Sequence, residues 1–173
     1  MVYDAALIVG GSLLVALAAQ VSIRLPFSPI PITGQTLAIL FVGALLGSRR
    51  GTLSLIVYLL QGLFGLPVFA SGASGLAYVM GPTGGYLVGF IAAAYMIGLL
   101  AERGWDRHVM STSLAMLIGN AVIYSFGLPW LSVYVGKQAV ALGLIPFVLG
   151  DVIKLALAAV ALPFGWKLLK IIS

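Results

Sequence analysis

The chain has 173 residues, of which 62% are hydrophobic and only 8% are charged, and its formal net charge is +5. A water-soluble domain carries about a quarter charged residues, so this composition excludes a soluble globular protein and predicts an integral membrane protein. A transmembrane helix needs about 20 mostly apolar residues. The length therefore allows about six spans in a single transmembrane domain, residues 1–173.

The charge and the rare residue types exclude several classes of function. The basic residues are scattered between apolar segments, which is typical of membrane topology signals and not of a nucleic-acid-binding surface. The absence of cysteine excludes disulfides and thiolate chemistry. The single histidine, His108, lies in a charged connection, so a histidine-rich metal centre is also excluded.

Six hydrophobic segments follow one another along the chain, at 4–24, 35–48, 51–66, 84–101, 109–128 and 146–166. The first has no basic region before its apolar run, so we interpret it as a retained span and not as a signal peptide. The stretch "GSRRG" separates the second from the third. Two adjacent arginines at the middle of a membrane would cost several kcal/mol, so we expect the chain to emerge there in a helical hairpin.

The connections between these segments alternate in character. Those after the second and fourth segments, and the C-terminal tail, are basic, and they hold six of the nine Lys/Arg: Arg49, Arg50, Arg103, Arg107, Lys167 and Lys170. The positive-inside rule places that side, with both termini, in the cytoplasm. The other three connections are rich in Pro, Gly and aromatic residues, and we expect them to form shaped loops over the outer end of an all-α bundle of six helices.

The stretch "GDVIK", residues 150–154, places two charges inside the last apolar segment. Asp151 and Lys154 are three residues apart and therefore lie on one face of a helix, where they can form an ion pair. One interpretation is that the pair only holds the bundle together. The other is that it marks a solute path, since charges inside a membrane usually face a cavity. A carboxylate beside an ammonium suits a small amphoteric solute.

Other polar and aromatic side chains fall in the same outer half of the expected bundle. They are Gln35 and Thr36 at the start of the second segment, Tyr78 in a loop, Tyr86 at the start of the fourth segment and Asn120 inside the fifth. Each has a structural alternative: Asn120 can bridge helices, Gln35 can cap one, and the tyrosines, with Trp130 and Tyr134 in the last outer loop, can form an interfacial belt.

The stretch "GPTGGYLVGF", residues 81–90, is a turn followed by paired glycines at a helix start. Gly84 and Gly85 would let a ligand approach the backbone closely, or would let two helices pack. Together with "PIPITGQTL" (29–37), "GLPVFA" (65–70), "GNAVIY" (119–124) and "GDVIK", this motif resembles the BioY family. Members are the biotin-binding S components of energy-coupling factor (ECF) transporters, and the motifs extend over most of the chain.

The resemblance implies a role for each group of residues. It implies six helices with cytoplasmic termini in a bacterial or archaeal cell membrane, and biotin bound beneath the outer loops by Gln35, Thr36, Tyr78, Gly84, Gly85, Tyr86, Asn120, Asp151 and Lys154. No catalytic residue, metal or cofactor is implied. Gly34 departs from the pattern, because a larger apolar residue is expected there.

The resemblance also implies partners, a transmembrane coupling subunit and two ATPase subunits, since the chain has no nucleotide-binding motif. Small residues Ala5, Ser12, Ala16 and Ala19 form a stripe along the first segment. Such stripes let helices approach closely in lipid. One interpretation is that the stripe packs inside this bundle. The resemblance favours the other, that Ser12, Ala16 and Ala19 contact the coupling subunit.

Three alternatives differ from the biotin hypothesis. The first is an S component for another water-soluble vitamin. The second is an integral membrane enzyme, which would need clustered carboxylates or an activated nucleophile, whereas Asp151 is isolated from other acids in the sequence. The third is an ion channel built on Asp151 and Lys154.

Overall fold

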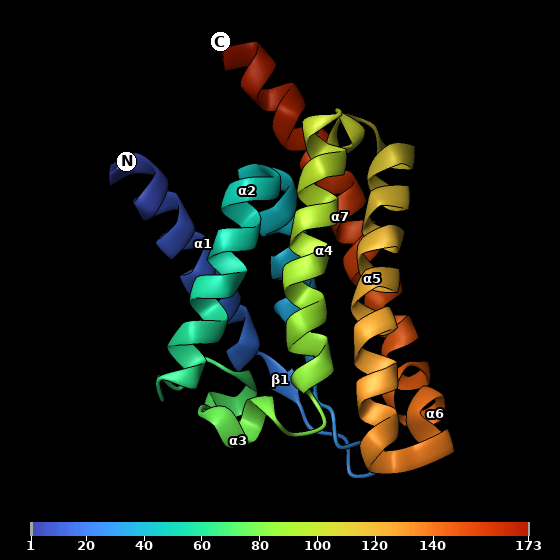
Figure 1. Ribbon diagram of the computed structural model, residues 1–173. Helices are drawn as coiled ribbons and strands as arrows, with labels where there is room; N and C mark the ends of the chain where they lie inside the picture. The colour runs from blue at the N-terminus through green and yellow to red at the C-terminus, as the bar shows by residue number, and fades with distance from the viewer. Residues whose placement is uncertain (1, 173) are drawn as a thin grey trace.

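The computed structural model describes residues 2–172, with side chains described for residues 2–167. Within this range five helices are long and apolar enough to cross a membrane (Figure 1). They are α1 (Val2–Gln20), α2 (Gln35–Leu63), α4 (Gly84–Glu102), α5 (Val109–Val135) and α7 (Ile145–Ile172). The short elements are β1 (Ser22–Ile23), β2 (Ile32–Thr33), η1 (Ala70–Gly72), α3 (Leu76–Val79), η2 (Trp105–Arg107), η3 (Gly136–Gln138) and α6 (Ala139–Gly143).

Helix α2 contains the expected hairpin. Gly47 has φ 77° and ψ 178°, a conformation that favours glycine, and it divides α2 into two halves that run beside each other in opposite directions (Figure 1). A Cβ atom added to Gly51 would lie 3.0 Å from Cα of Gly43, so the halves meet backbone to backbone across the turn. The segments predicted at 35–48 and 51–66 correspond to these two halves.

The turn of the hairpin is held by helix α4. One carboxylate oxygen of Glu102 accepts hydrogen bonds from the backbone N–H of Ser48 at 2.7 Å and from its hydroxyl at 2.8 Å. A negative charge at this position caps the first turn of the second half of α2. A Cβ atom on Gly98 would lie 2.2 Å from the Ser48 nitrogen, so α4 can reach the turn only with glycine there.

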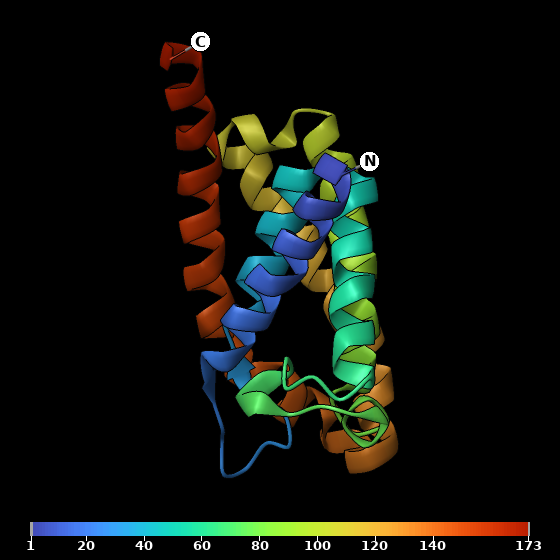
Figure 2. The same cartoon turned by 90° about the vertical axis from the view of Figure 1, so that its left-hand side faces the viewer.

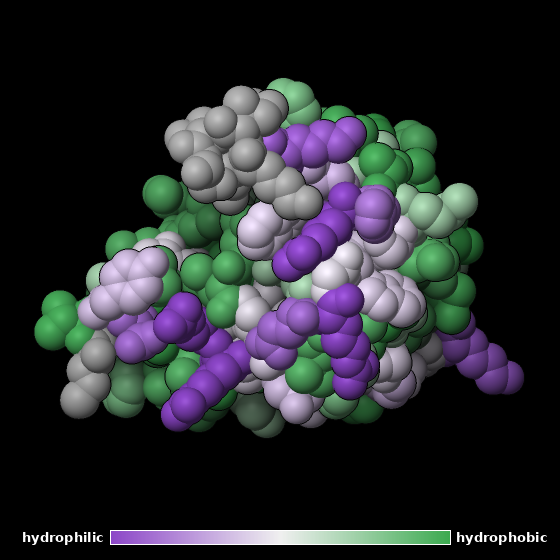
Figure 3. All heavy atoms as spheres, turned by 90° about the horizontal axis from the view of Figure 1, so that it is seen from above, coloured by the Kyte–Doolittle hydropathy of each residue, from purple (hydrophilic) through white to green (hydrophobic). Residues whose placement is uncertain are grey.

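The two ends of the molecule differ in chemistry. Helix α1 begins and α7 ends at the end that holds the Gly47 turn and the α4–α5 connection (Figures 1 and 2). Seen from that end, hydrophilic side chains gather on the face and hydrophobic ones dominate its rim (Figure 3). This is the distribution expected where apolar helices leave a bilayer.

The opposite end is covered by loops that are tied to one another. Strands β1 and β2 pair antiparallel, with Ser22 opposite Thr33. The hydroxyl of Ser28, between the strands, donates to the Leu142 carbonyl of α6 at 2.8 Å. The Tyr86 hydroxyl donates to the Gly143 carbonyl at 2.9 Å, which fixes α6 to α4. These contacts hold the outer loops above the bundle.

Helix α5 is longer than the sequence predicted. A loop was expected from residue 129, but the helix continues through Pro129 to Val135. Trp130 and Tyr134 therefore lie on the helix, where Trp130 Nε1 donates to the Gly81 carbonyl at 2.9 Å and the Tyr134 hydroxyl donates to the Met80 carbonyl. These two hydrogen bonds to the α3–α4 connection offset the backbone bond that a proline removes from a helix.

In the isolated chain, Ser12, Ala16 and Ala19, which were predicted to contact a coupling subunit, are buried. Their exposed fractions are 0%, 8% and 0%, and α1 packs mainly against the protein's own helix α2. Gln61 Nε2 of α2 donates to Ser12 Oγ at 3.4 Å. The small side chains let α1 pack closely within the bundle, which was the alternative interpretation of the stripe.

Candidate functional site

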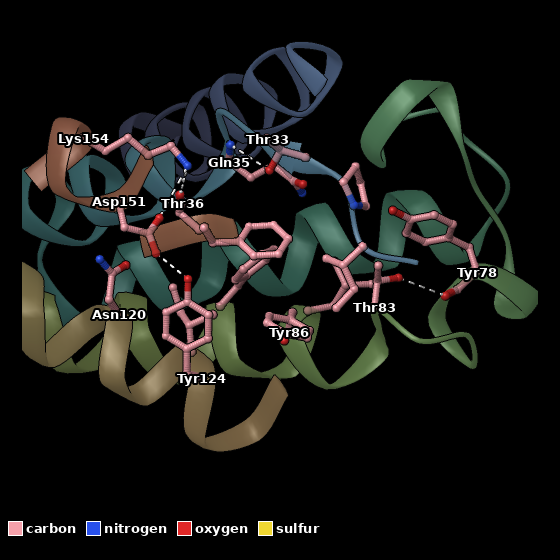
Figure 4. Close-up of a pocket in the computed structure, with 16 residues that line it drawn as sticks. Thr33, Gln35, Thr36, Tyr78, Thr83, Tyr86, Asn120, Tyr124, Asp151 and Lys154 are labelled. Carbon is pink, nitrogen blue, oxygen red and sulfur yellow. Dashed lines mark hydrogen bonds and ion pairs between the residues drawn. The ribbon is translucent and has the colours of Figure 1, made fainter. Parts of the chain in front are cut away.

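A cavity of about 50 Å³ lies beneath the outer loops, between the first turn of α2 and helices α4, α5 and α7 (Figure 4). Seven of the nine residues predicted to contact a ligand line it: Gln35, Thr36, Tyr78, Tyr86, Asn120, Asp151 and Lys154. They are separated by up to 119 residues in the sequence, from 35 to 154. The fold thus gathers most of the predicted residues around one space.

The charged pair of α7 lies at the deep side of this cavity. Asp151 is 7% exposed, and its Oδ1 lies 3.6 Å from Lys154 Nζ. Lys154 Nζ also donates to Thr36 Oγ1 at 2.8 Å, and the Tyr124 hydroxyl donates to Asp151 Oδ2. The pair therefore joins α7 to α2 and to α5, while part of each group still faces the cavity (Figure 4). Such pairing reduces the cost of burying both charges.

Two side-chain amides complete the polar part of the cavity. Asn120 is 9% exposed, and in the described part of the chain its side chain has no hydrogen-bond partner. Gln35 Nε2 donates to the Tyr58 hydroxyl at 2.7 Å, which in turn donates to the Val68 carbonyl at 3.2 Å. This chain of bonds turns the Gln35 amide into the cavity. Buried polar groups normally have a partner, so the Asn120 amide is available to hydrogen-bond a solute that enters the cavity.

The aromatic wall was only partly foreseen. The cavity is also lined by Phe90, Tyr124 and Phe147, each four residues along a helix from a residue already predicted, namely Tyr86, Asn120 and Asp151. Residues four apart share a helix face, so this spacing was a signal that could have identified them. The Tyr86 and Tyr124 rings meet edge to face, with centroids 6.2 Å apart.

Two threonines of the loop end were missed as well. Thr33, in β2, and Thr83, directly before α4, both line the cavity. Each lies inside a stretch already noted for its turn residues, "PIPITGQTL" or "GPTGGYLVGF". The hydroxyl of Thr83 donates to the Tyr78 carbonyl at 3.5 Å, which links the start of α4 to α3 (Figure 4).

Gly84 and Gly85 are not among the residues that line the cavity. A Cβ atom on Gly85 would lie 2.3 Å from Trp130 Cβ and 2.6 Å from the Phe126 carbonyl oxygen. On Gly84 it would lie 1.9 Å from the Val79 carbonyl oxygen. Both glycines therefore permit the close packing of α4 against α5 and the loop, and the prediction that they contact a ligand is corrected.

The unexpected glycine at position 34 has a steric explanation. A Cβ atom on Gly34 would lie 2.9 Å from the Ala18 carbonyl oxygen of α1, and the Gly34 N–H donates to the Val21 carbonyl at 2.9 Å. The backbone just before Gln35 thus runs against the end of α1. A larger residue at this position would push the first turn of α2, with Gln35 and Thr36, away from its place in the cavity.

The combination of groups suits binding and not catalysis. The cavity offers a carboxylate, an ammonium, two amides and an apolar aromatic wall, a set that fits a small solute with a polar ring and an apolar body. Among the residues that the structure describes, no three His, Asp or Glu side chains come together to hold a metal ion.

Comparisons with known proteins give a consistent result. The model of the BioY family matches residues 1–171. A protein of Rhizobium etli named "Biotin transporter BioY" is 38% identical over 170 residues, covering 91% of each chain. A protein of Thermotoga maritima with the same name is 41% identical over 140 residues, covering 79% of this chain and 81% of the relative.

A solved structure has the same fold. It is the crystal structure of "the S-component for biotin from an ECF-type ABC transporter", with a TM-score of 0.84 and 26% sequence identity. The match covers 96% of this chain and 92% of that one. The similarity therefore includes every long helix and the outer loops together, and is not limited to a shared hairpin.

Proposed function

Because this chain belongs to the BioY family, we propose that it is the biotin-binding S component of an ECF-type ABC transporter. In this role residues 1–173 form a single transmembrane substrate-binding domain that takes up biotin and carries out no chemistry itself. The energy comes from ATP hydrolysis on partner subunits. The observation that carries the proposal is the cavity beneath the outer loops, with its charged pair and its unpartnered amide.

The chemistry of biotin matches this cavity. Its ureido ring has two N–H donors and one carbonyl acceptor, its sulfur-containing ring is apolar, and its side chain ends in a carboxylate. Asp151 can accept a ureido N–H, and charge-assisted hydrogen bonds of this kind are strong. The Asn120 and Gln35 amides can serve the remaining ureido groups. The side chains of Tyr86 and Phe90 can cover the apolar ring.

The bonds of Lys154 favour one orientation of biotin. Its ammonium is already engaged by Asp151 and Thr36, so it supports the carboxylate of Asp151 and is not a free cation for an acid. The ureido ring then lies deep, beside Asp151. The carboxylate of biotin then points toward the outer loops, whose sequence contains no Asp or Glu to repel it.

The proposed topology has six crossings with both termini in the cytoplasm. Each half of α2 crosses once, as do α1, α4, α5 and α7. Six Lys/Arg residues were predicted on the cytoplasmic side, and they support this topology. Four of them lie in the hairpin turn and the α4–α5 connection, which are at the same end of the molecule as the start of α1. The surrounding lipid bilayer is the plasma membrane of the cell, and the cavity opens to the outside.

The proposed partners are one transmembrane coupling subunit and two ATPase subunits. The name of the similar structure, an S component of an ECF-type ABC transporter, supports an assembly of this kind. Ser12, Ala16 and Ala19 are buried in the isolated chain, so a contact between them and the coupling subunit requires α1 to turn in the bundle.

The test is direct binding by the purified full-length chain. A ligand present at 100 times its dissociation constant stabilises a protein by about 2.7 kcal/mol, so biotin should raise the melting temperature clearly. Thiamine, riboflavin and niacin, tested in parallel, should not. A shift with another vitamin alone would assign the chain to a different solute. The absence of any shift, together with no biotin retained through purification, would refute the proposal.

A further inference from the structure

A second hollow, of about 460 Å³, opens at the loop end of the molecule. It lies between residues 24–31, η1 and the α3–α4 connection, and we call it the outer vestibule. Pro31, Tyr78 and Thr83 line both the outer vestibule and the inner cavity, and we call these three residues the neck. The residues of the neck thus border both spaces.

Arg24 is the single charged residue among those that line the outer vestibule. Its Nε donates to Ser71 Oγ at 3.3 Å, and Ser71 Oγ lies 2.8 Å from Ser22 Oγ. Ser71 has a φ of 58°, which is uncommon for a residue with a side chain. The Ser71 hydroxyl therefore holds the guanidinium of Arg24 at the outer vestibule. The terminal nitrogens of the guanidinium are left for another acceptor.

The protein supplies no counter-ion for this guanidinium in the part that the structure describes. The chain has four acidic residues, and their partners lie elsewhere: Asp4 pairs with Arg50, Glu102 with Ser48, Asp106 with Trp166 and Asp151 with Lys154. Arg24 thus gives the vestibule a positive potential that no nearby carboxylate cancels. A cleft lined by one sign of charge raises the local concentration of oppositely charged solutes.

The inner cavity is the smaller of the two spaces. Its volume of about 50 Å³ corresponds to a few water molecules, compared with about 460 Å³ for the outer vestibule. A solute that arrives from the loop end through the outer vestibule passes the neck before it reaches Asp151. The outer vestibule is therefore the first space that such a solute enters.

The positive charge of Arg24 also acts on Tyr78, one of the residues of the neck. Burial raises the pKa of the Tyr78 phenol above its usual range, and the charge of Arg24 acts in the opposite direction. Arg24 and the residues of the neck also line the same hollow, so an anion bound at Arg24 lies in the space that the neck borders.

We propose that the outer vestibule is a capture site for an ionised carboxylate, in which Arg24 holds the acid end of the incoming solute before the neck opens. This inference rests on the proposed function, in which the solute is biotin. In this proposal Arg24 increases the rate at which biotin associates with the protein. The final complex is held mainly by the inner cavity, so Arg24 contributes little to the rate of dissociation.

The experiment measures association and dissociation rates of radiolabelled biotin by rapid filtration, with the full chain in detergent at low and high salt. Arg24→Gln should slow association about threefold to tenfold at low salt, and the difference should vanish at about 0.5 M salt, where charges are screened. Arg24→Lys should keep most of the rate. Lys137→Gln removes the other cation of the outer loops, which does not line the vestibule, and should have no effect.

A neutral probe completes the test. For biotinamide, which lacks the charge, Arg24→Gln and the unchanged protein should associate at the same rate. A normal association rate of Arg24→Gln at low salt would overturn the inference. An equal loss of association rate for biotin and biotinamide would also overturn it, as would a change in the dissociation rate alone. Failure of the unchanged protein to bind biotin at all would instead refute the proposed function.

Discussion

Lys154 of α7 donates a 2.8 Å hydrogen bond to Thr36 of α2, a closer contact than its 3.6 Å approach to Asp151 on its own helix. Because Asp151 also accepts a hydrogen bond from Tyr124 of α5, three helices meet at the charged pair. The structural and functional interpretations of "GDVIK" are therefore compatible. The pair joins the helices, and the same groups face the cavity.

We expect Asp151→Asn to weaken biotin binding at least tenfold. A hydrogen bond to a charged group contributes about 1.5–3 kcal/mol, and the variant keeps the shape of the side chain but loses its charge. Isothermal titration of the purified protein gives the dissociation constant. Tyr124→Phe is the matched control, because it removes a hydrogen bond to the same carboxylate and leaves the charge, so its effect should be smaller. Normal binding by Asp151→Asn would reduce the pair to a structural role.

The double variant separates the two roles of the pair. Lys154→Ala alone should reduce both expression and binding, because it leaves the buried carboxylate of Asp151 without its ammonium. Adding Asp151→Asn removes that unpaired charge and should restore expression without restoring binding. Recovery of binding in the double variant would show that neither charge contacts biotin.

Asn120→Leu should weaken biotin binding about fivefold to tenfold without lowering the melting temperature. The Asn120 amide has no described partner, so its removal deprives the ligand of a hydrogen bond and deprives the protein of none. Ser125→Ala is the control on the same helix, since that exposed hydroxyl bonds only within α5, to Val122. A clear loss of stability in Asn120→Leu would favour a bridge between helices.

Much of the bundle could be predicted because its determinants are local in the sequence. Apolar length defines the long helices, and the adjacent charges of Arg49 and Arg50 are enough to require a turn near Gly47. The end of α5 could not be predicted in this way. Pro129 and the preceding Gly127 are typical of a loop, and the helix continues because Trp130 and Tyr134 bond to a connection far away in sequence.

The candidate site, like the bundle, could be predicted only in part. Gln35, Asn120 and Asp151 are polar in apolar surroundings, so composition alone singles them out, and the fold then gathers them around the cavity. The paired glycines carried no such signal. Ligand contact and helix packing both require a missing side chain, and only the position of Trp130 decides between them.

Gly85→Ala should destabilise the fold and not merely block the cavity. The added methyl would lie 2.3 Å from Trp130 Cβ and 2.6 Å from the Phe126 carbonyl oxygen, and backbone cannot yield as a flexible side chain can. Size-exclusion chromatography in detergent should show aggregation or a melting temperature lowered by several degrees. Gly10→Ala is the control, since nothing lies within 4 Å of its added methyl. A stable Gly85→Ala protein that fails to bind biotin would return this glycine to the ligand site.

The last prediction concerns the buried face of α1. Ala16 is 8% exposed and faces α2, whereas the adjacent Leu17 is 70% exposed on the other side of the helix. Ala16→Trp must force α1 away from α2, and overpacking of this kind typically costs about 1–3 kcal/mol or more. We expect a lower melting temperature and weaker biotin binding, because α1 also contacts the backbone before Gln35 through Ala18 and Gly34. Leu17→Trp should leave both unchanged in the isolated protein. If Ala16→Trp instead kept normal stability and biotin binding but no longer co-purified with a coupling subunit, Ala16 would belong to that interface, and α1 would have to turn in the bundle when the transporter assembles.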